Sequence, residues 1–179
     1  MAPHNITQPP GSILELAFVV DNLEQAAIRW VDTARAGPFF LIEHLEIVNA
    51  LYHNEPGNID VSIALGFSGS LCVELIQQHD SAPSIFRDFT PQSDGGFHHW
   101  GITTREFDQD ITRYEQSGYP LVFSGAVAVG GRFAFMDTSR QMHGMVELIE
   151  LTPLVQDLFA GIEAGSKNWD GNEPIRRFT

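Results

Sequence analysis

The chain has 179 residues, of which 43% are hydrophobic and 18% are charged. Ten Lys and Arg residues stand against 23 Asp and Glu residues, which gives a formal net charge of −13. This composition is typical of a globular protein with one domain or two small modules that share a core. The negative charge makes nucleic acid and anionic membrane surfaces unfavourable partners.

The cysteine content and the N-terminal residues exclude further classes. Cys72 is the only cysteine, so the chain has no internal disulfide, which fits a reducing compartment. The first residues lack the basic region and apolar core of a secretory signal, and no apolar stretch approaches the ~20 residues of a membrane helix. We therefore expect a cytoplasmic protein with no membrane partner.

The first half of the chain shows the hydrophobic periods of one helix and several strands. The polar residues 1–11, which end in Pro9-Pro10-Gly11, are expected to form a flexible arm. Asn22 can cap the helix that begins at Leu23, where apolar residues recur at helical spacing. The strands of this half are expected over 14–20, 39–50, 61–67 and 71–77.

The second half repeats the same order of elements. We expect strands over 97–103, 121–129, 132–137 and 145–151, a helix over 107–116, and a tail helix over 154–164. Both halves therefore have the order strand, helix, strand, strand, strand, which predicts an α+β fold of two βαβββ modules. The predicted organisation is a flexible arm at 1–11, a first module at 12–80, a linker at 81–95, a second module at 96–152, and a C-terminal helix and tail at 153–179.

Four side chains at matching positions of the two modules could bind a metal. The tetrapeptide Val-Glu-Leu-Ile occurs once in each half and places Glu74 and Glu147 inside runs typical of buried strands. A buried carboxylate is unfavourable unless it is compensated, and a metal ion can compensate it. Glu15 and His99 lie on the first strands, each seven residues before the residue that opens the following helix. Pseudo-twofold packing of the modules would bring all four together.

Three carboxylates and one imidazole form an oxygen-rich ligand set. We predict one divalent metal ion at Glu15, Glu74, His99 and Glu147, with Mn²⁺, Co²⁺, Ni²⁺, Fe²⁺, Mg²⁺ and Zn²⁺ all compatible. Without a metal the carboxylates would repel one another, and at least one would take up a proton. The adjacent His98 is expected to point to the opposite face of its strand and to be structural.

The duplicated unit, with ligands on its first and last strands, resembles the vicinal oxygen chelate superfamily. This superfamily includes glyoxalase I, methylmalonyl-CoA epimerase, extradiol dioxygenases and bleomycin-resistance proteins. The resemblance is nearest the glyoxalase I and epimerase-like branch, in the segments 37–40, 96–99 and 146–149. It implies a cupped mixed sheet around a metal-binding cleft, followed by a C-terminal helix. Glu15 departs from the pattern, because epimerases have His and some glyoxalases have Gln there, whereas Glu74 matches the glyoxalases.

The resemblance implies a metal-dependent lyase or isomerase that acts through an enediolate on a small carbonyl or acyl-thioester substrate. Glu147 is the first candidate for the catalytic base and Glu15 the second. One alternative is a metal-free, ligand-sequestering protein of the bleomycin-resistance type. Another is an extradiol dioxygenase, which ranks last because it needs two His ligands and only His99 is available. The superfamily and the apolar tail helix also predict a homodimer.

Overall fold

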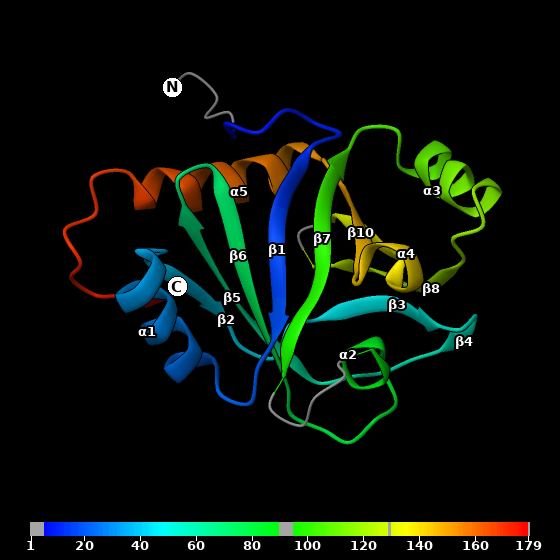
Figure 1. Cartoon of the computed structure of the whole chain (residues 1–179), viewed down its shortest axis with the longest axis horizontal. Coiled ribbons are helices and arrows are strands. Elements are labelled where there is room, and N and C mark those ends of the chain that lie inside the picture. Colours follow the sequence, from blue (N-terminus) through cyan, green and yellow to red (C-terminus); the bar gives the residue numbers. More distant parts are fainter. Residues whose placement is uncertain (1–5, 90–94, 129, 179) are drawn as a thin grey trace.

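The protein forms one curved, mixed sheet of 11 strands with helices packed on it, as a computed structural model shows for residues 6–89, 95–128 and 130–178 (Figure 1). The first half contains β1 (Ile13–Val19), α1 (Leu23–Ala34), β2 (Phe39–Ile42), β3 (Ile47–Tyr52), β4 (Glu55–Pro56), β5 (Val61–Ser68), β6 (Leu71–Gln78) and the short α2 (Ile85–Asp88). The second half contains β7 (Gly96–Thr104), α3 (Phe107–Gln116), β8 (Leu121–Val127), β9 (Arg132–Met136), α4 (Ser139–Met142), β10 (Met145–Glu150), α5 (Pro153–Ser166) and β11 (Ile175–Arg177). The predicted α+β fold class is confirmed.

The sheet has an internal pseudo-twofold relation about its centre. Its strand order is β11-β2-β5-β6-β1-β7-β10-β9-β8-β3-β4. The central strands β1 and β7 are antiparallel, and each pairs in parallel with the last strand of its own half, β6 or β10. Strands β2-β5-β6-β1 thus mirror β8-β9-β10-β7. Figure 1 shows β1 and β7 side by side along the middle of the sheet.

The helices α1 and α3 cover the outer face of the two halves. The Asn22 side chain accepts a hydrogen bond from the Gln25 backbone N–H at 2.9 Å, which caps α1 as predicted. Strands β5 and β6 turn Ala64, Val73 and Leu75 toward α1. Helix α3 packs through Phe107 on the corresponding residues of β9 and β10. The alternate residues of these strands therefore face the concave side.

The expected strand over 39–50 is divided into β2 and β3. The chain turns between them, with His44 in the left-handed region at φ 48°, in a segment that carries three charged or titratable residues. Strand β2 stays in its own half beside β5, whereas β3 pairs with β8 of the other half. The first half thus supplies β3, with β4 at the outer edge, to the side of the sheet that the second half forms.

The chain ends differ from the sequence expectation in two respects. Helix α5 packs its apolar side on β5 through Val155, Phe159 and Ile162, so this face gives no separate support for a dimer. After α5 the chain adds β11 beside β2. The expected arm lies partly outside the described residues, which begin at Ile6, and the Thr7 N–H donates to the Glu163 carboxylate at 2.9 Å. Among the described helices, none has the length and apolar character that crossing a membrane requires.

Candidate metal centre

The four predicted ligands lie in two adjacent rows on the concave face, at the junction of the two modules. The first row runs across four strands as Glu74, Ala17, His99 and Met145. The second row runs as Cys72, Glu15, Gly101 and Glu147. Exchanging the two halves converts one row into the other, because each row contains a ligand at its outer strand, a small residue, a ligand, and a sulfur-containing residue. The small Ala17 and Gly101 leave room for the longer side chains beside them.

The His99 imidazole lies at the centre of the three carboxylates. Its Nε2 is 3.1 Å from Glu147 Oε2, 3.4 Å from Glu74 Oε2 and 3.6 Å from Glu15 Oε1. One potential ligand atom from each residue lies within 4.8 Å of all the others. On a metal with ligand distances of about 2.1 Å, neighbouring ligand atoms stand about 3.0 to 3.4 Å apart at octahedral or tetrahedral angles. The three distances from His99 Nε2 are therefore close to the separations of ligand atoms around one ion.

These side chains are nearly inaccessible to solvent. The exposed fraction of the side chain is 0% for His99, 2% for Glu15, 12% for Glu74 and 13% for Glu147. The His99 Nε2 is buried and has no hydrogen-bond partner of good geometry. Unpartnered buried polar atoms are rare and unfavourable. A cation among these groups would satisfy the nitrogen and the carboxylates at once.

The electrostatics of the cluster favour a positive ion or bound protons. Burial and the repulsion of Glu74 raise the pKa of Glu15 to about 8, and burial also raises the pKa of Glu74. Burial opposes charging of His99, but the nearby carboxylates of Glu147, Glu15 and Glu74 outweigh it and raise the pKa of His99 well above its usual value. Burial and the two nearby carboxylates likewise raise the pKa of the Cys72 thiol. A divalent ion would replace the protons that Glu15, Glu74 and His99 retain, so the four ligand residues fit a metal.

Irregularities in the central ladder position the first-strand ligands. The register between β1 and β7 shifts twice, so that Leu14 is an extra residue in β1 and His98 an extra residue in β7. Each of these β-bulges immediately precedes a ligand, Glu15 or His99. A bulge interrupts the alternation of side chains and re-aims its neighbours. The prediction that His98 points to the opposite face is therefore wrong, because it assumed an uninterrupted strand.

His98 instead contacts the candidate ligand next to it. Its Nδ1 lies 2.9 Å from His99 Nδ1, and its Nε2 lies 3.1 Å from the carbonyl oxygen of Ile85, the first residue of α2. A carbonyl oxygen only accepts, so the Nε2 of His98 carries the proton. Burial, followed by the charge of His99, lowers the pKa of His98 to about 3, which keeps this ring neutral. Its Nδ1 must then accept from the Nδ1–H of His99, whose Nε2 is left to face the carboxylates.

Gly101 is a second residue that the sequence reasoning missed. A Cβ atom at this position would lie 2.7 Å from Glu15 Oε1 and 2.8 Å from Glu15 Cβ. Only glycine therefore leaves Glu15 its present place. The signal in the sequence was weak, namely a glycine two residues beyond His99 on the same strand, whereas the part played by His98 had no signal beyond adjacency.

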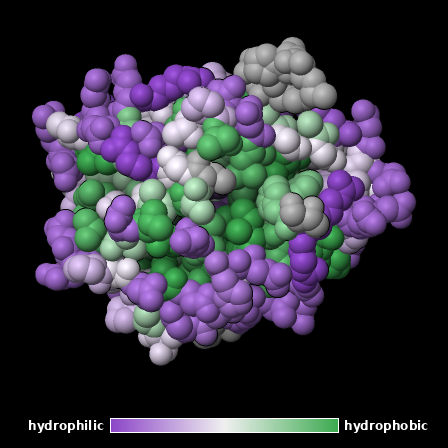
Figure 2. Space-filling view, turned by 180° about the vertical axis from the view of Figure 1, so that it is seen from behind, coloured by the Kyte–Doolittle hydropathy of each residue, from purple (hydrophilic) through white to green (hydrophobic). Residues whose placement is uncertain are grey.

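The carboxylates form the floor of a cleft of about 470 Å³ on the concave face. Glu15, Glu74 and Glu147 line its bottom, and its walls are built from Val, Ile, Leu and Phe side chains. Figure 2 shows hydrophobic residues at the bottom of a hollow that is ringed mainly by hydrophilic ones. Both the size and the few convergent polar groups are typical of a small-molecule site.

Comparison with solved structures shows the same fold in several proteins. Methylmalonyl-CoA epimerase from Mycobacterium tuberculosis aligns with a TM-score of 0.58 at 16% identity, over 83% of this chain and 93% of that one. A hypothetical protein from Bacillus halodurans C-125 aligns with a TM-score of 0.55 at 16% identity, over 79% and 94%. Streptomyces coelicolor methylmalonyl-CoA epimerase in complex with 2-nitronate-propionyl-CoA gives 0.50 at 13% identity, over 79% and 98%. At these identities the likeness concerns the fold alone.

Sequence comparison identifies the family. No curated protein matches the chain significantly. The sequence profile of one superfamily, however, matches residues 15–135, from the first candidate ligand into β9. This agrees with the resemblance found in the duplicated βαβββ unit. The chain therefore belongs to the glyoxalase/bleomycin resistance protein/dioxygenase superfamily.

Proposed function

We propose that this protein is a divalent-metal-dependent lyase or isomerase that abstracts a proton next to a carbonyl group of a small substrate. The observation that supports this most directly is the buried cluster of three carboxylates around the unpartnered His99 Nε2, at the floor of an apolar cleft. A fold maintained without a ligand would not favour such a cluster, because burying like charges together is strongly unfavourable.

Glu15, Glu74, His99 and Glu147 would hold the metal. When bound, a divalent ion would act as a Lewis acid that stabilises the negative charge of an enediolate. The donor set is rich in oxygen, which is compatible with Mn²⁺, Co²⁺, Ni²⁺, Fe²⁺, Mg²⁺ or Zn²⁺. His98 fixes the ring orientation and tautomer of His99, and the apolar walls exclude water from the substrate.

Glu147 is the base in this proposal. Its side chain is the most exposed of the four, and it lines the cleft, so a substrate can contact it. Glu147 removes the proton from the carbon next to the carbonyl and returns one to the same intermediate, which gives an epimer or an isomer. Glu15 is the second candidate, because it also lines the cleft but its side chain is more deeply buried.

Metal analysis and proton exchange test this function together. We expect one divalent ion per chain, and deuterium wash-in from heavy water into a 2-hydroxy carbonyl compound, measured by NMR. Glu147→Gln keeps the size and one oxygen of the side chain but cannot accept the proton, so it should abolish exchange. Glu115→Gln on the exposed face of α3 is the matched control and should exchange normally. Equal exchange in Glu147→Gln and the wild type would move the role of base to Glu15.

The two alternative functions have distinct outcomes in the same experiments. Tight binding of an apolar ligand with no metal after reconstitution would favour the ligand-sequestering function. A dioxygenase needs a second His ligand, and both ring nitrogens of His98 are already engaged with His99 and Ile85. The homodimer remains a prediction from the family resemblance, to be measured by light scattering.

A further inference from the structure

The cleft divides into a polar floor and an apolar body. Above the carboxylates, the second module contributes an aromatic wall in which the ring of Phe123 lies 5.3 Å from that of Phe133 and 5.9 Å from that of Phe135. The first module contributes an aliphatic wall that includes Ile63 and Ile76. Helix α5 adds three further residues to the lining, Val155, Leu158 and Phe159. A ligand that reaches the floor must bury most of its surface against hydrocarbon.

Two arginines in or next to the lining of the cleft, Arg132 and Arg177, are already neutralised. Arg132 is the only Lys or Arg among the described lining residues, and its guanidinium bonds Asp108 at 2.8 Å and Glu150 at 2.8 Å. Arg177, next to the lining residue Phe178, lies between Glu24 at 3.0 Å and Glu43 at 3.3 Å. Each arginine therefore belongs to a group with a net negative charge.

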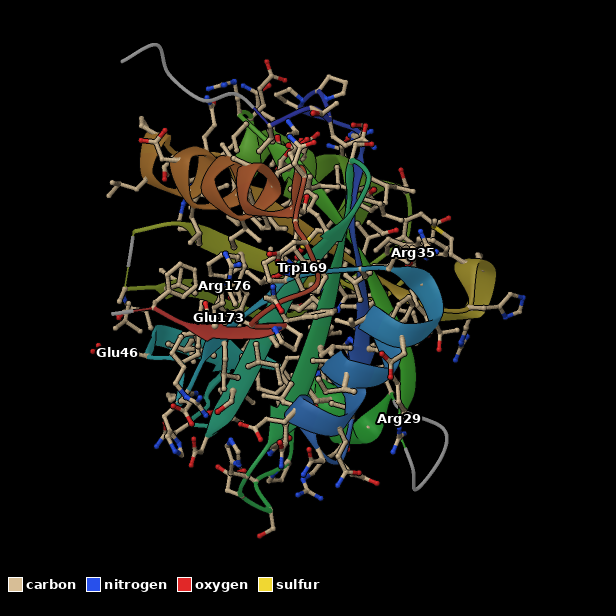
Figure 3. The ribbon with its side chains drawn as sticks, turned by 90° about the vertical axis from the view of Figure 1, so that its left-hand side faces the viewer. Arg29, Arg35, Glu46, Trp169, Glu173 and Arg176 are labelled. Atoms are coloured by element: carbon tan, nitrogen blue, oxygen red, sulfur yellow. The ribbon has the colours of Figure 1, made fainter. Side chains whose placement is uncertain are left out.

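Two further rim residues, Glu46 and His44, add no free positive charge. Glu46 lines the cleft and is exposed, and Figure 3 shows its side chain at the outer edge of the molecule, directed away from the ribbon. The His44 imidazole lies 2.6 Å from Asp60, so any positive charge that it carries is balanced. An anionic group at this rim would meet no free cation among the described lining residues and would be repelled by exposed carboxylates.

From these features we infer that the substrate is an uncharged carbonyl compound with a hydrophobic, ring-containing body, held directly in the cleft and not presented on a polyanionic carrier such as coenzyme A. This inference rests on the proposed function, because it takes the carboxylate floor as the end where the carbonyl oxygens bind. It also separates this chain from the Streptomyces coelicolor epimerase of the same fold, whose structure contains 2-nitronate-propionyl-CoA.

Three thioesters of one series test the inference. The mandelyl thioester of N-acetylcysteamine has an α-hydroxy carbonyl unit, a phenyl ring and no charge. The lactyl thioester of the same thiol replaces the ring by a methyl group, and mandelyl-CoA adds the phosphates. Titration calorimetry on the Mn²⁺-loaded full chain at low ionic strength gives the three Kd values, and NMR in heavy water gives proton exchange for each compound.

The neutral mandelyl ester should bind about 10- to 100-fold more tightly than the lactyl ester, since the walls bury the ring. Mandelyl-CoA should bind at least about tenfold more weakly than its neutral counterpart. This difference in Kd should decrease near 1 M salt, where the Debye length falls to about 3 Å. Glu46→Lys should decrease the difference in Kd between mandelyl-CoA and the neutral mandelyl ester more than Glu46→Gln does, because Glu46→Gln removes the charge without reversing it.

The possible failures are distinguishable. If the neutral mandelyl ester binds best but no compound exchanges its proton, the proposed function fails and the ligand class stands. Equal or tighter binding of mandelyl-CoA at low salt would overturn the inferred class, whether or not exchange occurs. Equal binding of the lactyl ester, or no measurable binding of the neutral mandelyl ester, would overturn it as well.

Discussion

Replacing His98 by Phe should weaken metal binding without removing a ligand. The phenyl ring keeps the shape of the imidazole beside Phe86 and Phe135, whose ring centroids lie 5.1 and 6.0 Å away. It removes the acceptor that lies 2.9 Å from His99 Nδ1. The Nδ1–H of a fully buried ring then has no partner, which destabilises the fold by about 1–3 kcal/mol.

The effect on the metal follows from the tautomer of His99. With His98 in place, the proton stays on Nδ1 and the Nε2 lone pair is available to the ion. Losing such a partner of a ligating His typically lowers metal affinity by about 10- to 100-fold. Calorimetric titration with Mn²⁺ and Zn²⁺ measures the change. In ¹⁵N-histidine spectra of the Zn²⁺-loaded protein, the wild type should show His99 protonated at Nδ1.

A matched variant separates this effect from a packing defect. His98→Asn places a side-chain oxygen near the position of the imidazole Nδ1, so it can still accept from His99 while it loses the bond to Ile85. It should recover most of the metal affinity that His98→Phe loses. The reasoning is refuted if His98→Phe binds both metals as tightly as the wild type, or if His98→Asn is impaired equally in affinity.

Three further predictions concern the ligand cluster itself. Gly101→Ala should lower both metal affinity and the melting temperature, since its Cβ would lie 2.8 Å from Glu15 Cβ and overpacking destabilises by about 1–3 kcal/mol; normal metal binding would show that Glu15 can move. The metal-free protein should lose stability as the pH rises from 4.5 to about 8, by on the order of a few kcal/mol, because the folded state keeps the proton of Glu15 that the unfolded state releases. The raised pKa of His99 acts in the same direction, because its contribution to stability is present at low pH and is lost as the pH rises through its folded-state pKa. Thermal melts with a chelator measure how the stability changes with pH, and a saturating metal should reverse the change. A metal-free stability that increases with pH would contradict the prediction. Glu15→His should retain metal and bind Zn²⁺ better relative to Mg²⁺, because Zn²⁺ accepts nitrogen well; competition titrations give the ratio, and loss of all metal would show that the third carboxylate is essential.

Local patterns in the sequence predicted most of the elements and all four members of the cluster. The helix over 107–116 and the strand bearing Glu147 follow directly from apolar periods, and the repetition of those periods in both halves located Glu15 and His99 at matching positions of the two modules. The division of 39–50 was missed because the partner of β3 is β8, more than 70 residues farther along the chain. Pairing between strands of different modules does not change the local hydrophobic period of either strand.

The true direction of His98 was missed for a different physical reason. Strand periodicity assumes that every residue advances the ladder by one step, and a bulge breaks that rule with a single residue of ordinary type. Leu14 and His98 are both plausible residues in an uninterrupted strand, so neither residue type indicates a bulge. The roles of His98 and Gly101 became visible only with the register of the paired strands.

The two bulges have a joint effect on the central ladder. Each inserts one residue into one of two facing strands, and because they lie on opposite strands their offsets cancel. Outside the pair of bulges β1 and β7 keep one alignment, while the short stretch between them is displaced by a single step. That displaced stretch contains both Glu15 and His99. The cluster therefore lies on a short stretch of the ladder between β1 and β7 that has a bulge at each end. Sliding of either strand would have to remove both bulges at once. Changes at the edges of the sheet therefore do not alter the spacing of the ligands.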